Sequence, residues 1–411
     1  MKNRSWIWFF IAVVLLVAGL LMRSGPLALV AAVLLLVEIL VRLWQNYGLD
    51  RVTYRRRLGA ERVFCGEEVS FEAEVVNDKL LPLPWIDIRD EIPDSVTMLT
   101  GKPEPSPERD RMELGHFFPL MWYEKVTRRY RLLCPKRGAY TFGPSRVHTG
   151  DLFGLTESDT GFYEIHNLIV YPKVVPLDEL NIPSAAMLGE IRTRRSIHHD
   201  PILTLGVREY QSGDSLKHIH WKTSARVGRL QTKVYEPTTS VDIGVFIDVR
   251  TTIPPIWGTI PHLTELVIVT AASICYYANN AGYRCGLYIN EARYRSGEAL
   301  SIPPGLHADQ LPSLLESLAR VDRRPNESMP IGTLVLREGP RLPWGSTVAV
   351  ISATPTEGLI SALHKVKRAG RVVALIVVGN AQAPFEGEGL NIYRVPEDIS
   401  WDKLTTISLR K

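Results

Sequence analysis

Cysteine is scarce in this chain, and its charge is nearly balanced. The 411 residues include four cysteines without a C-x-x-C pair, at Cys65, Cys134, Cys275 and Cys285. This spacing argues against both a zinc ribbon and a disulfide framework, and it favours a reducing compartment. A formal net charge of +4 gives no case for binding nucleic acid.

The chain also lacks the short motifs of common enzymes. It has no G-x-x-x-x-G-K-[ST], G-x-G-x-x-G or G-x-S-x-G sequence, so nucleotide binding and serine catalysis have no support, and no small-molecule substrate is indicated. The runs His198-His199-Asp200 and His218-x-His220 keep a metal-dependent hydrolase at the membrane as an alternative. Against it, helical residues two apart do not share a face, so His218 and His220 are poorly spaced for one ion.

Residues 1–45 predict a transmembrane helical hairpin. Two apolar runs, 6–22 and 27–41, are separated by Arg23-Ser-Gly-Pro, and each is near the lower limit of about 17–25 residues for a spanning helix. The alternative is a cleaved signal peptide. Arg23 directly after the first run, and a second apolar run at once, favour the hairpin.

Cationic residues predict the sidedness of this hairpin. Lys2 and Arg4 precede it, and Arg42, Arg51 and the run 55–57 follow it, whereas the loop between its helices holds only Arg23. The positive-inside rule therefore predicts a multi-pass protein with its soluble domains on the cytoplasmic side of the cell membrane. The three consecutive arginines are also compatible with a solvated linker.

Residues 50–175 read as an all-β domain. The stretches 69–76 and 126–132 alternate apolar and polar residues with period two, and prolines divide the region into short strands. We expect an antiparallel β-sandwich that resembles an immunoglobulin-like module.

Residues 238–411 alternate strand and helix patterns. This order predicts a largely parallel, doubly wound sheet with helices on both faces. The expected strands include 241–248, 285–290, 347–352 and 372–378, and the expected helices are 263–280, 308–321 and 357–368.

The segment 176–237 joins these two regions and contains the most unusual stretch, 206–237. We expect a strand over 207–210, a turn at Gly213, and a helix that begins at Asp214 or Ser215 and runs to Ala225. Gly228 is expected to end this helix before a second strand over 230–235.

This stretch resembles the signature of the domain of unknown function 58 (DUF58) family, with Lys217 and His220 departing from the family's usual arginine and aspartate. The resemblance implies a bacterial protein with a signature that binds a partner or is structural. The matching residues are Tyr210, Gly213, Asp214, Lys217, Ile219, Trp221, Lys222, Ala225 and Arg226.

The carboxyl-terminal region resembles a von Willebrand factor type A-like domain, in which an Asp-x-Ser-x-Ser loop binds Mg²⁺. Asp248 and Thr252 stand at two of the corresponding positions, while Arg250 brings a cation to a third. Hard cations need several oxygen ligands, so we expect a degraded metal site and no cofactor.

Together these features predict a non-enzymatic, membrane-anchored interaction or adaptor protein. Resemblance to the DUF58 family implies a MoxR-type AAA+ ATPase as partner and a role in envelope or complex maturation. A structural or adhesive module that faces outward is a further alternative, and it would require the opposite sidedness.

Overall fold

The computed structural model describes residues 2–176, 199–211, 219–237, 242–252, 259–292, 299–321, 329–380 and 389–397, without the side chains of 2–8, 199–206, 233–237 and 292. The chain divides into two compact units, Met1–Pro172 and Lys173–Lys411. Each is described by itself. The predicted boundaries near residues 45 and 237 stay predictions.

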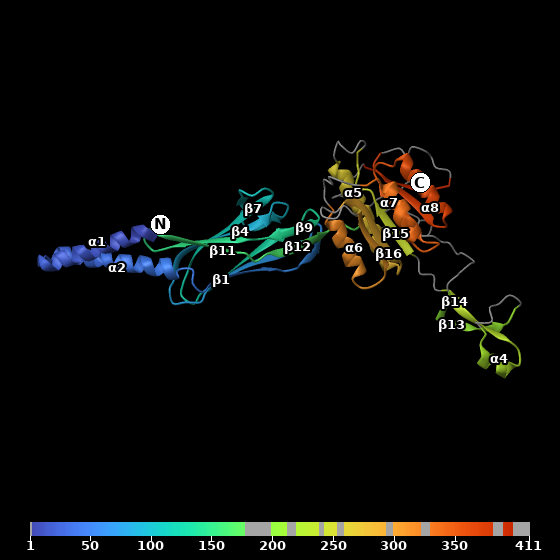
Figure 1. The fold of residues 1–411 in the computed structure, drawn as a ribbon, viewed down its shortest axis with the longest axis horizontal. Coiled ribbons are helices and arrows are strands. Elements are labelled where there is room, and N and C mark those ends of the chain that lie inside the picture. Colours follow the sequence, from blue (N-terminus) through green and yellow to red (C-terminus); the bar gives the residue numbers. More distant parts are fainter. Residues whose placement is uncertain are drawn as a thin grey trace. The chain divides into compact units, whose positions relative to one another are not determined.

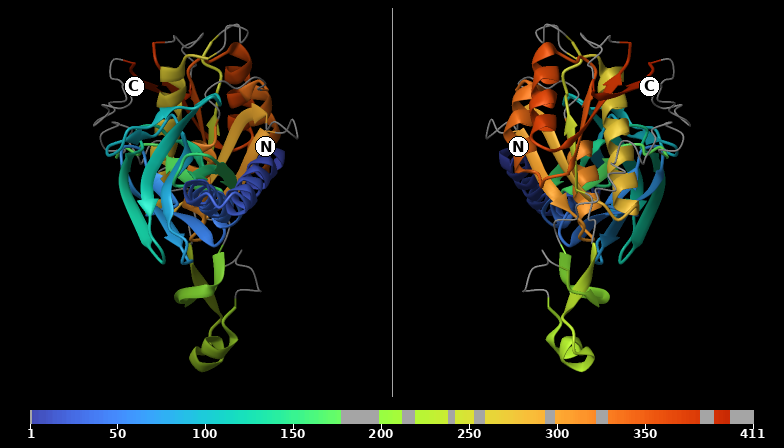
Figure 2. Two further views of the ribbon diagram at one scale, coloured as in Figure 1. Left: turned by 90° about the vertical axis from the view of Figure 1, so that its left-hand side faces the viewer. Right: turned by 90° about the vertical axis from the view of Figure 1, so that its right-hand side faces the viewer.

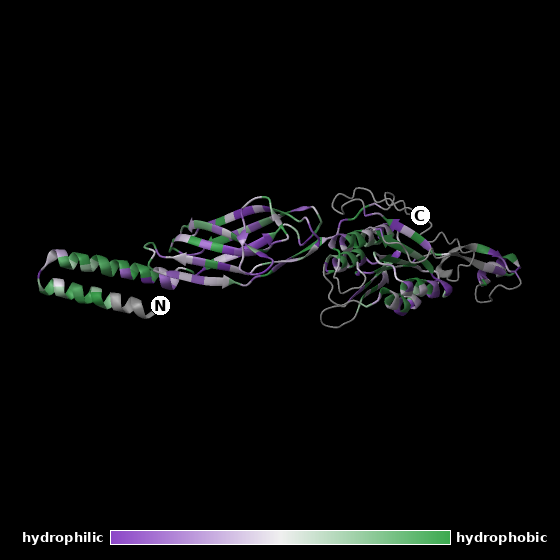
Figure 3. Ribbon diagram, turned by 90° about the horizontal axis from the view of Figure 1, so that it is seen from above, coloured by the Kyte–Doolittle hydropathy of each residue, from purple (hydrophilic) through white to green (hydrophobic). Residues whose placement is uncertain are grey.

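Two antiparallel helices open the first unit, α1 (Lys2–Leu21) and α2 (Gly25–Tyr47) (Figure 1). Among the described residues, α2 is the one helix that is long and apolar enough to cross a membrane, and the apolar part of α1, Phe9–Leu21, is shorter. Figure 3 shows the apolar character of α2 along most of its length. Near its end, Arg42 pairs with Glu38 across one helical turn at 3.0 Å.

Antiparallel strands build the rest of this unit, which we call the β-domain. One sheet has the order β1-β3-β8-β5, a second β11-β10-β4-β7-β6, and a third β2-β12-β9 with β2 and β12 parallel. The strands are β1 (Val52–Leu58), β2 (Arg62–Phe64), β3 (Glu68–Asn77), β4 (Leu83–Pro93), β5 (Thr97–Met98), β6 (Glu104–Pro105), β7 (Arg111–Leu120), β8 (Lys125–Leu133), β9 (Gly138–Phe142), β10 (Ser145–Gly150), β11 (Glu157–Phe162) and β12 (His166–Tyr171).

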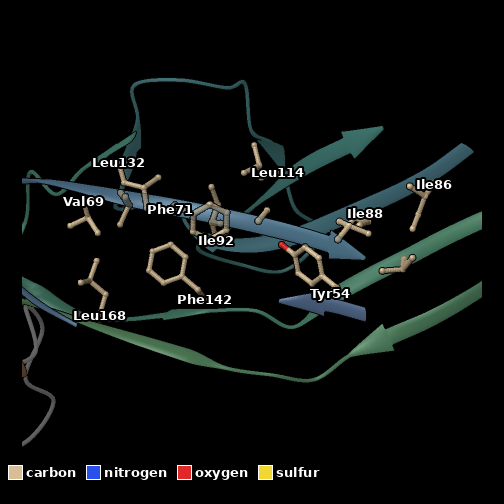
Figure 4. Packing of buried hydrophobic residues seen from close by; sticks show 14 of the residues in the cluster. Tyr54, Val69, Phe71, Ile86, Ile88, Ile92, Leu114, Leu132, Phe142 and Leu168 are labelled. Carbon is tan, nitrogen blue, oxygen red and sulfur yellow. The ribbon is translucent and has the colours of Figure 1, made fainter. Parts of the chain in front are cut away.

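The sheets of the β-domain share one hydrophobic core. Phe71 from β3, Ile88 from β4, Phe142 from β9 and Leu168 from β12 all lie in this core (Figure 4). On β3 every second side chain is buried, as the alternating sequence predicts. Burial of these alternate faces is the main force that holds the sheets together.

The three consecutive arginines do not form a linker. Arg55, Arg56 and Arg57 all lie in β1, paired with Glu74, Ala73 and Glu72 of β3. Arg56 points into the interior, where it is buried beside Asp90. The expectation of a solvated linker was therefore wrong, because the pleat of β1 turns the middle arginine inward.

Lys79 is a buried lysine in the loop after β3. Its amine has no hydrogen-bond partner among the described residues. Burial lowers the pKa of Lys79 to about 8 from 10.5, while the nearby Asp50 acts in the opposite direction. The folded protein therefore binds fewer protons than the unfolded chain between these values, and its stability rises with pH across this window.

Lys79→Met is expected to raise the free energy of unfolding of the β-domain by about 1–3 kcal/mol at pH 7, because it removes a desolvated charge. The gain should shrink toward pH 10. Hydrogen–deuterium exchange of β3 and β4 in the detergent-solubilised full chain measures it. Lys102→Met, at an exposed position, is the control. An equal effect of both variants at both pH values would contradict the expectation.

The second unit contains a six-stranded mixed sheet with the order β17-β16-β15-β18-β19-β20. All neighbours are parallel except β16 and β17. The strands are β15 (Asp242–Ile247), β16 (Arg284–Ala292), β17 (Ala299–Gly305), β18 (Thr347–Ser352), β19 (Val372–Val378) and β20 (Asn391–Val395); the helices are α5 (Pro261–Asn280), α6 (Gln310–Ala319), α7 (Ile331–Glu338) and α8 (Glu357–Arg368), with a 3-10 turn at Gly339–Arg341.

Helices cover both faces of this sheet, which confirms the predicted mixed α/β architecture. Phe246 and Val350 pack with Leu334 of α7 and Leu363 of α8 in one core layer. The helix α5 packs on the sheet and against α6, and Figure 2 shows α5 on the opposite face from α7 and α8. Burial on both faces explains why β15, β18 and β19 are almost continuously apolar.

Candidate functional site

The described part of the DUF58-like signature forms a β-hairpin with a short helix. Strands β13 (His199–Glu209) and β14 (Gln231–Pro237) pair antiparallel, and α4 (Trp221–Val227) lies between them in sequence. Figure 1 shows α4 at the closed end of this hairpin. Strand β14 lies near the predicted range 230–235, whereas β13 ends near the predicted 207–210 but begins well before it, at His199. Gly213, Asp214 and Lys217 lie outside the described residues.

The predicted helix start at Asp214 or Ser215 lies outside the described residues, and in the described part α4 begins only at Trp221 and runs to Val227. His220 is the residue before the helix, and its Nδ1 accepts a hydrogen bond from the Thr223 backbone N–H at 3.1 Å. Ile219 is buried and bridges to Thr232 of β14 instead of continuing a helix. A side-chain acceptor at this position satisfies one of the backbone donors that a helix start leaves free.

His220 therefore has a structural role at the start of α4. The metal-hydrolase alternative would instead use it as a metal ligand. Its backbone N–H also donates to the Gln231 carbonyl at 2.8 Å, which ties the helix start to β14. The structure does not describe the side chains of His198, His199, Asp200 and His218. Among the described residues no group of three or more His, Cys, Asp or Glu side chains is placed to hold a metal ion.

Ser224 fastens the middle of α4 to the hairpin. Its buried hydroxyl donates to the His220 carbonyl at 3.0 Å and accepts from the Gln231 N–H at 2.9 Å. Gly228 then ends the helix with φ of +72°, a left-handed conformation that favours glycine. This ending was predicted, whereas the role of Ser224 was missed because a lone serine in a helix carries no sequence signal.

The remaining signature residues on α4 face outward. Trp221 is 68% exposed, and Lys222, Ala225 and Arg226 are exposed on the same short helix, while Tyr210 is half-buried. Spacing of four residues places Trp221 beside Ala225, and Lys222 beside Arg226. Sequence reasoning left open whether Trp221 is a core anchor or an interface residue. The fold places it on the surface.

A second polar group lies at the carboxyl ends of the central parallel strands. Asp248 follows β15, Asn290 ends the apolar run of β16, and Ser352 ends β18. The carboxyl edge between β15 and β18, where the strand order reverses, is where ligands commonly bind in such sheets.

Asp248 is buried, and both carboxylate oxygens accept hydrogen bonds. Oδ1 accepts from Asn290 Nδ2 at 2.8 Å and from the Arg250 backbone N–H at 3.2 Å, and Oδ2 accepts from the Ser352 hydroxyl at 2.9 Å. Burial raises the pKa of Asp248, and these hydrogen bonds oppose the rise. The Thr354 hydroxyl donates to the Arg250 carbonyl at 3.2 Å, which joins the segment after β18 to the segment after β15.

The hydrogen bonds around Asp248 are better suited to a structural role than to binding a cation. Asp248 is its one carboxylate, and protein donors occupy the two oxygens that a Mg²⁺ ion would need. Thr252, the second predicted position, is half-buried. Asn290 was missed as a partner, although a polar residue that ends an apolar strand is a usable signal.

Comparison with known curated proteins finds a partial match. The chain is 28% identical over 206 residues to "Uncharacterized protein YeaD" of Bacillus subtilis, covering 49% of this chain and 49% of that protein. The chain thus spans about half the length of the curated relative that it matches.

Solved structures show only weak likeness. A CARDB domain from Pyrococcus furiosus (12% identity, TM-score 0.21) and a non-cellulosomal cohesin from Archaeoglobus fulgidus (8%, TM-score 0.20) each cover 29% of this chain and 91% of their own. TM-scores this low do not establish a shared fold. Residues 206–398, in contrast, match the family model described as "Protein of unknown function DUF58", which confirms for this segment the family that the Tyr210–Arg226 signature predicts.

Proposed function

We propose that the protein is a non-enzymatic, membrane-anchored adaptor that binds a protein partner through the exposed face of α4. The observation that carries this proposal is Trp221, a large aromatic side chain left 68% exposed on a helix that is fixed at both ends. Tryptophan and arginine dominate the energetics of protein interfaces. Here Trp221 and Arg226 lie on one short helix. That helix is already formed before any partner binds.

The partner that we propose is a MoxR-type AAA+ ATPase, in envelope or complex maturation, as resemblance to the DUF58 family implies. The strand order β17-β16-β15-β18-β19-β20, with an antiparallel β17, supports a von Willebrand factor type A-like domain. The shared core of the antiparallel sheets supports an immunoglobulin-like β-domain. Both are part of the proposal.

The anchor that we propose is the α1–α2 hairpin, with both helices in the membrane and the soluble domains in the cytoplasm. The length and apolar composition of α2 support it. Because Arg56 is buried in the β-domain, the sidedness rests on Lys2, Arg4, Arg42, Arg51, Arg55 and Arg57. A periplasm-only reporter fused to Lys411 should be inactive, and its activity would contradict this orientation.

Trp221→Ala in the full chain is expected to reduce the recovery of the partner from native membranes by about tenfold or more, the loss typical of an interface hot spot. Val227→Ala is the matched control, because Val227 is also exposed on α4. Co-purification followed by mass spectrometry measures both recovery and partner identity.

Two outcomes of this experiment would count against the proposal. Equal recovery with Trp221→Ala and wild type would remove α4 as the binding surface. Repeated absence of any AAA+ ATPase from the wild-type sample would remove the proposed partner.

A further inference from the structure

Three loops of the β-domain meet at the end where α2 enters it. Val52, the first residue of β1, pairs with Asn77, the last residue of β3, so the loop 78–82 begins at that end. Leu83 of β4 pairs with Leu120 of β7, which places the loop 121–124 beside it. Thr149, near the end of β10, pairs with Ile86 near the start of β4, so the loop 151–156 lies there too.

These loops expose large apolar side chains instead of polar ones. Leu80 is 73% exposed, Tyr123 65% and Leu155 61%. Soluble surfaces seldom gather so many large apolar side chains, and such gatherings mark interaction sites. We call the set the loop rim, and it consists of Leu80, Met121, Trp122, Tyr123, Leu152, Phe153 and Leu155.

Polar contacts fix the backbone of the loop rim. Asp151 accepts from the backbone N–H groups of Phe153 at 2.7 Å and of Thr156 at 2.6 Å. Asn77 Nδ2 donates to the carbonyls of Leu81 at 3.0 Å and Met121 at 2.8 Å, which joins two of the loops. The exposed side chains are therefore held outward by an ordered backbone, at little further entropy cost on binding.

The loop rim adjoins the end of α2. Trp44 Nε1 donates to the Pro82 carbonyl at 2.8 Å, so the last turns of α2 lie beside the loop 78–82. Leu43 and Tyr47 remain exposed on α2 up to that point. The headgroup layers extend about 5–7 Å beyond the hydrocarbon on each side of a bilayer, so a membrane that surrounds α2 reaches the level of these loops.

We infer that the loop rim inserts into the membrane interface, so that the β-domain rests on the lipid surface in addition to being tethered by α2. This inference rests on the proposed membrane anchoring. Tryptophan and tyrosine are the residues enriched at the headgroup level. Continuity with α2 favours lipid over a second copy of the chain, since a dimer contact would need to compete with the bilayer at that surface.

Spin labels in the full chain, reconstituted in phosphatidylcholine–phosphatidylglycerol liposomes, test this inference. A Cys65→Ser background removes the one cysteine that is not buried. Labels go to Leu80→Cys and Leu152→Cys on the loop rim, with Leu155→Cys as a replacement should either variant misfold. Val33→Cys, exposed on α2, reports the anchor.

Tyr163→Cys is the matched control, a label position that is expected to stay in water. Tyr163 is 81% exposed, and it follows Phe162, whose partner Ser145 is at the opposite end of β10 from Gly150. Labels on the loop rim are expected to collide with a water-soluble nickel complex several-fold less often than the label at 163, and with oxygen more often.

The possible outcomes distinguish a failure of loop-rim insertion from a failure of the membrane anchor. A lipid-exposed label at 33 with water-exposed labels at 80 and 152 would overturn the inference and leave the anchor standing. A water-exposed label at 33 would overturn the anchor and with it the inference. Rim labels shielded from nickel equally in liposomes and in detergent, without increased oxygen collision, would indicate a protein contact and also overturn it.

Discussion

Asp90→Ala is expected to lower the free energy of unfolding of the β-domain by about 3–5 kcal/mol, because it leaves a buried arginine without its counter-ion. Asp90 is fully buried, and Arg56 Nη1 lies 3.8 Å from its Oδ1. The Ser145 hydroxyl donates to Oδ1 at 2.5 Å, and the Tyr54 hydroxyl donates to Oδ2. One carboxylate thus pairs with side chains from two strands, β1 and β10.

Two further side chains complete this cluster. His116 Nε2 lies 3.3 Å from Asp90 Oδ2, and its Nδ1 lies 2.9 Å from the Tyr130 hydroxyl. Burial, followed by the charge of Asp90, raises the pKa of Tyr54 well above its ordinary value, so Tyr54 keeps the proton that it donates. Loss of Asp90 therefore leaves several buried polar groups unpaired at once.

Hydrogen–deuterium exchange of β1, β4 and β10 in the detergent-solubilised full chain measures this loss, since exchange reports local opening free energies. Asp94→Ala, at an exposed position of the same domain, is the control and is expected to change stability by less than about 0.5 kcal/mol. The double variant Arg56→Met with Asp90→Leu should recover part of the loss, because it removes both charges. Unchanged exchange in Asp90→Ala would show that the cluster does not stabilise the domain.

Asp248→Ala is expected to lower the free energy of unfolding of the mixed sheet by about 3 kcal/mol, because it leaves the buried donors of Asn290 and Ser352 without an acceptor. Exchange of β15 and β18 in the same preparation measures it. Asp309→Ala, exposed in the same domain, is the control. Stability equal to wild type would contradict a structural role, and sub-millimolar Mg²⁺ binding by calorimetry would instead favour a metal site.

The pH dependence of Asp248 has a definite sign. Its folded-state pKa is raised above the ordinary 3.8, with burial as the largest cause. The folded protein therefore binds more protons than the unfolded chain above pH 3.8, and its stability falls as the pH rises from there through the folded-state pKa. Asp248→Asn removes this titration, so the difference in stability between wild type and Asp248→Asn should change across that window and be constant above it.

Much of the mixed sheet could be predicted from local pattern. The strands 347–352 and 372–378 and the helix 357–368 lie where they were expected, since strands buried on both faces are continuously apolar and an amphipathic helix repeats every 3.6 residues. The helix α7 and strands β17 and β20 were missed. Each is short or has a partly exposed pattern, so its order depends on packing against neighbours.

The candidate site was harder to predict, because its geometry depends on contacts between distant residues. The capping role of His220 depends on Thr223 and on the pairing with Gln231, and the roles of Asp248 and Arg56 depend on strands more than thirty residues away. The apolar loops were visible as sequence, yet their meeting at one end follows from strand register.

The sequence by itself determined the order of an apolar helical segment, an all-β region and an α/β region, and the likeness of residues 206–398 to the DUF58 family. These properties reside in residue periodicity and local motifs, which need no distant contact. Only the tertiary structure decided that Trp221 is exposed, that both oxygens of Asp248 are occupied, and that seven apolar loop residues gather beside α2. Exposure and hydrogen-bond satisfaction belong to pairs of residues that folding alone brings together.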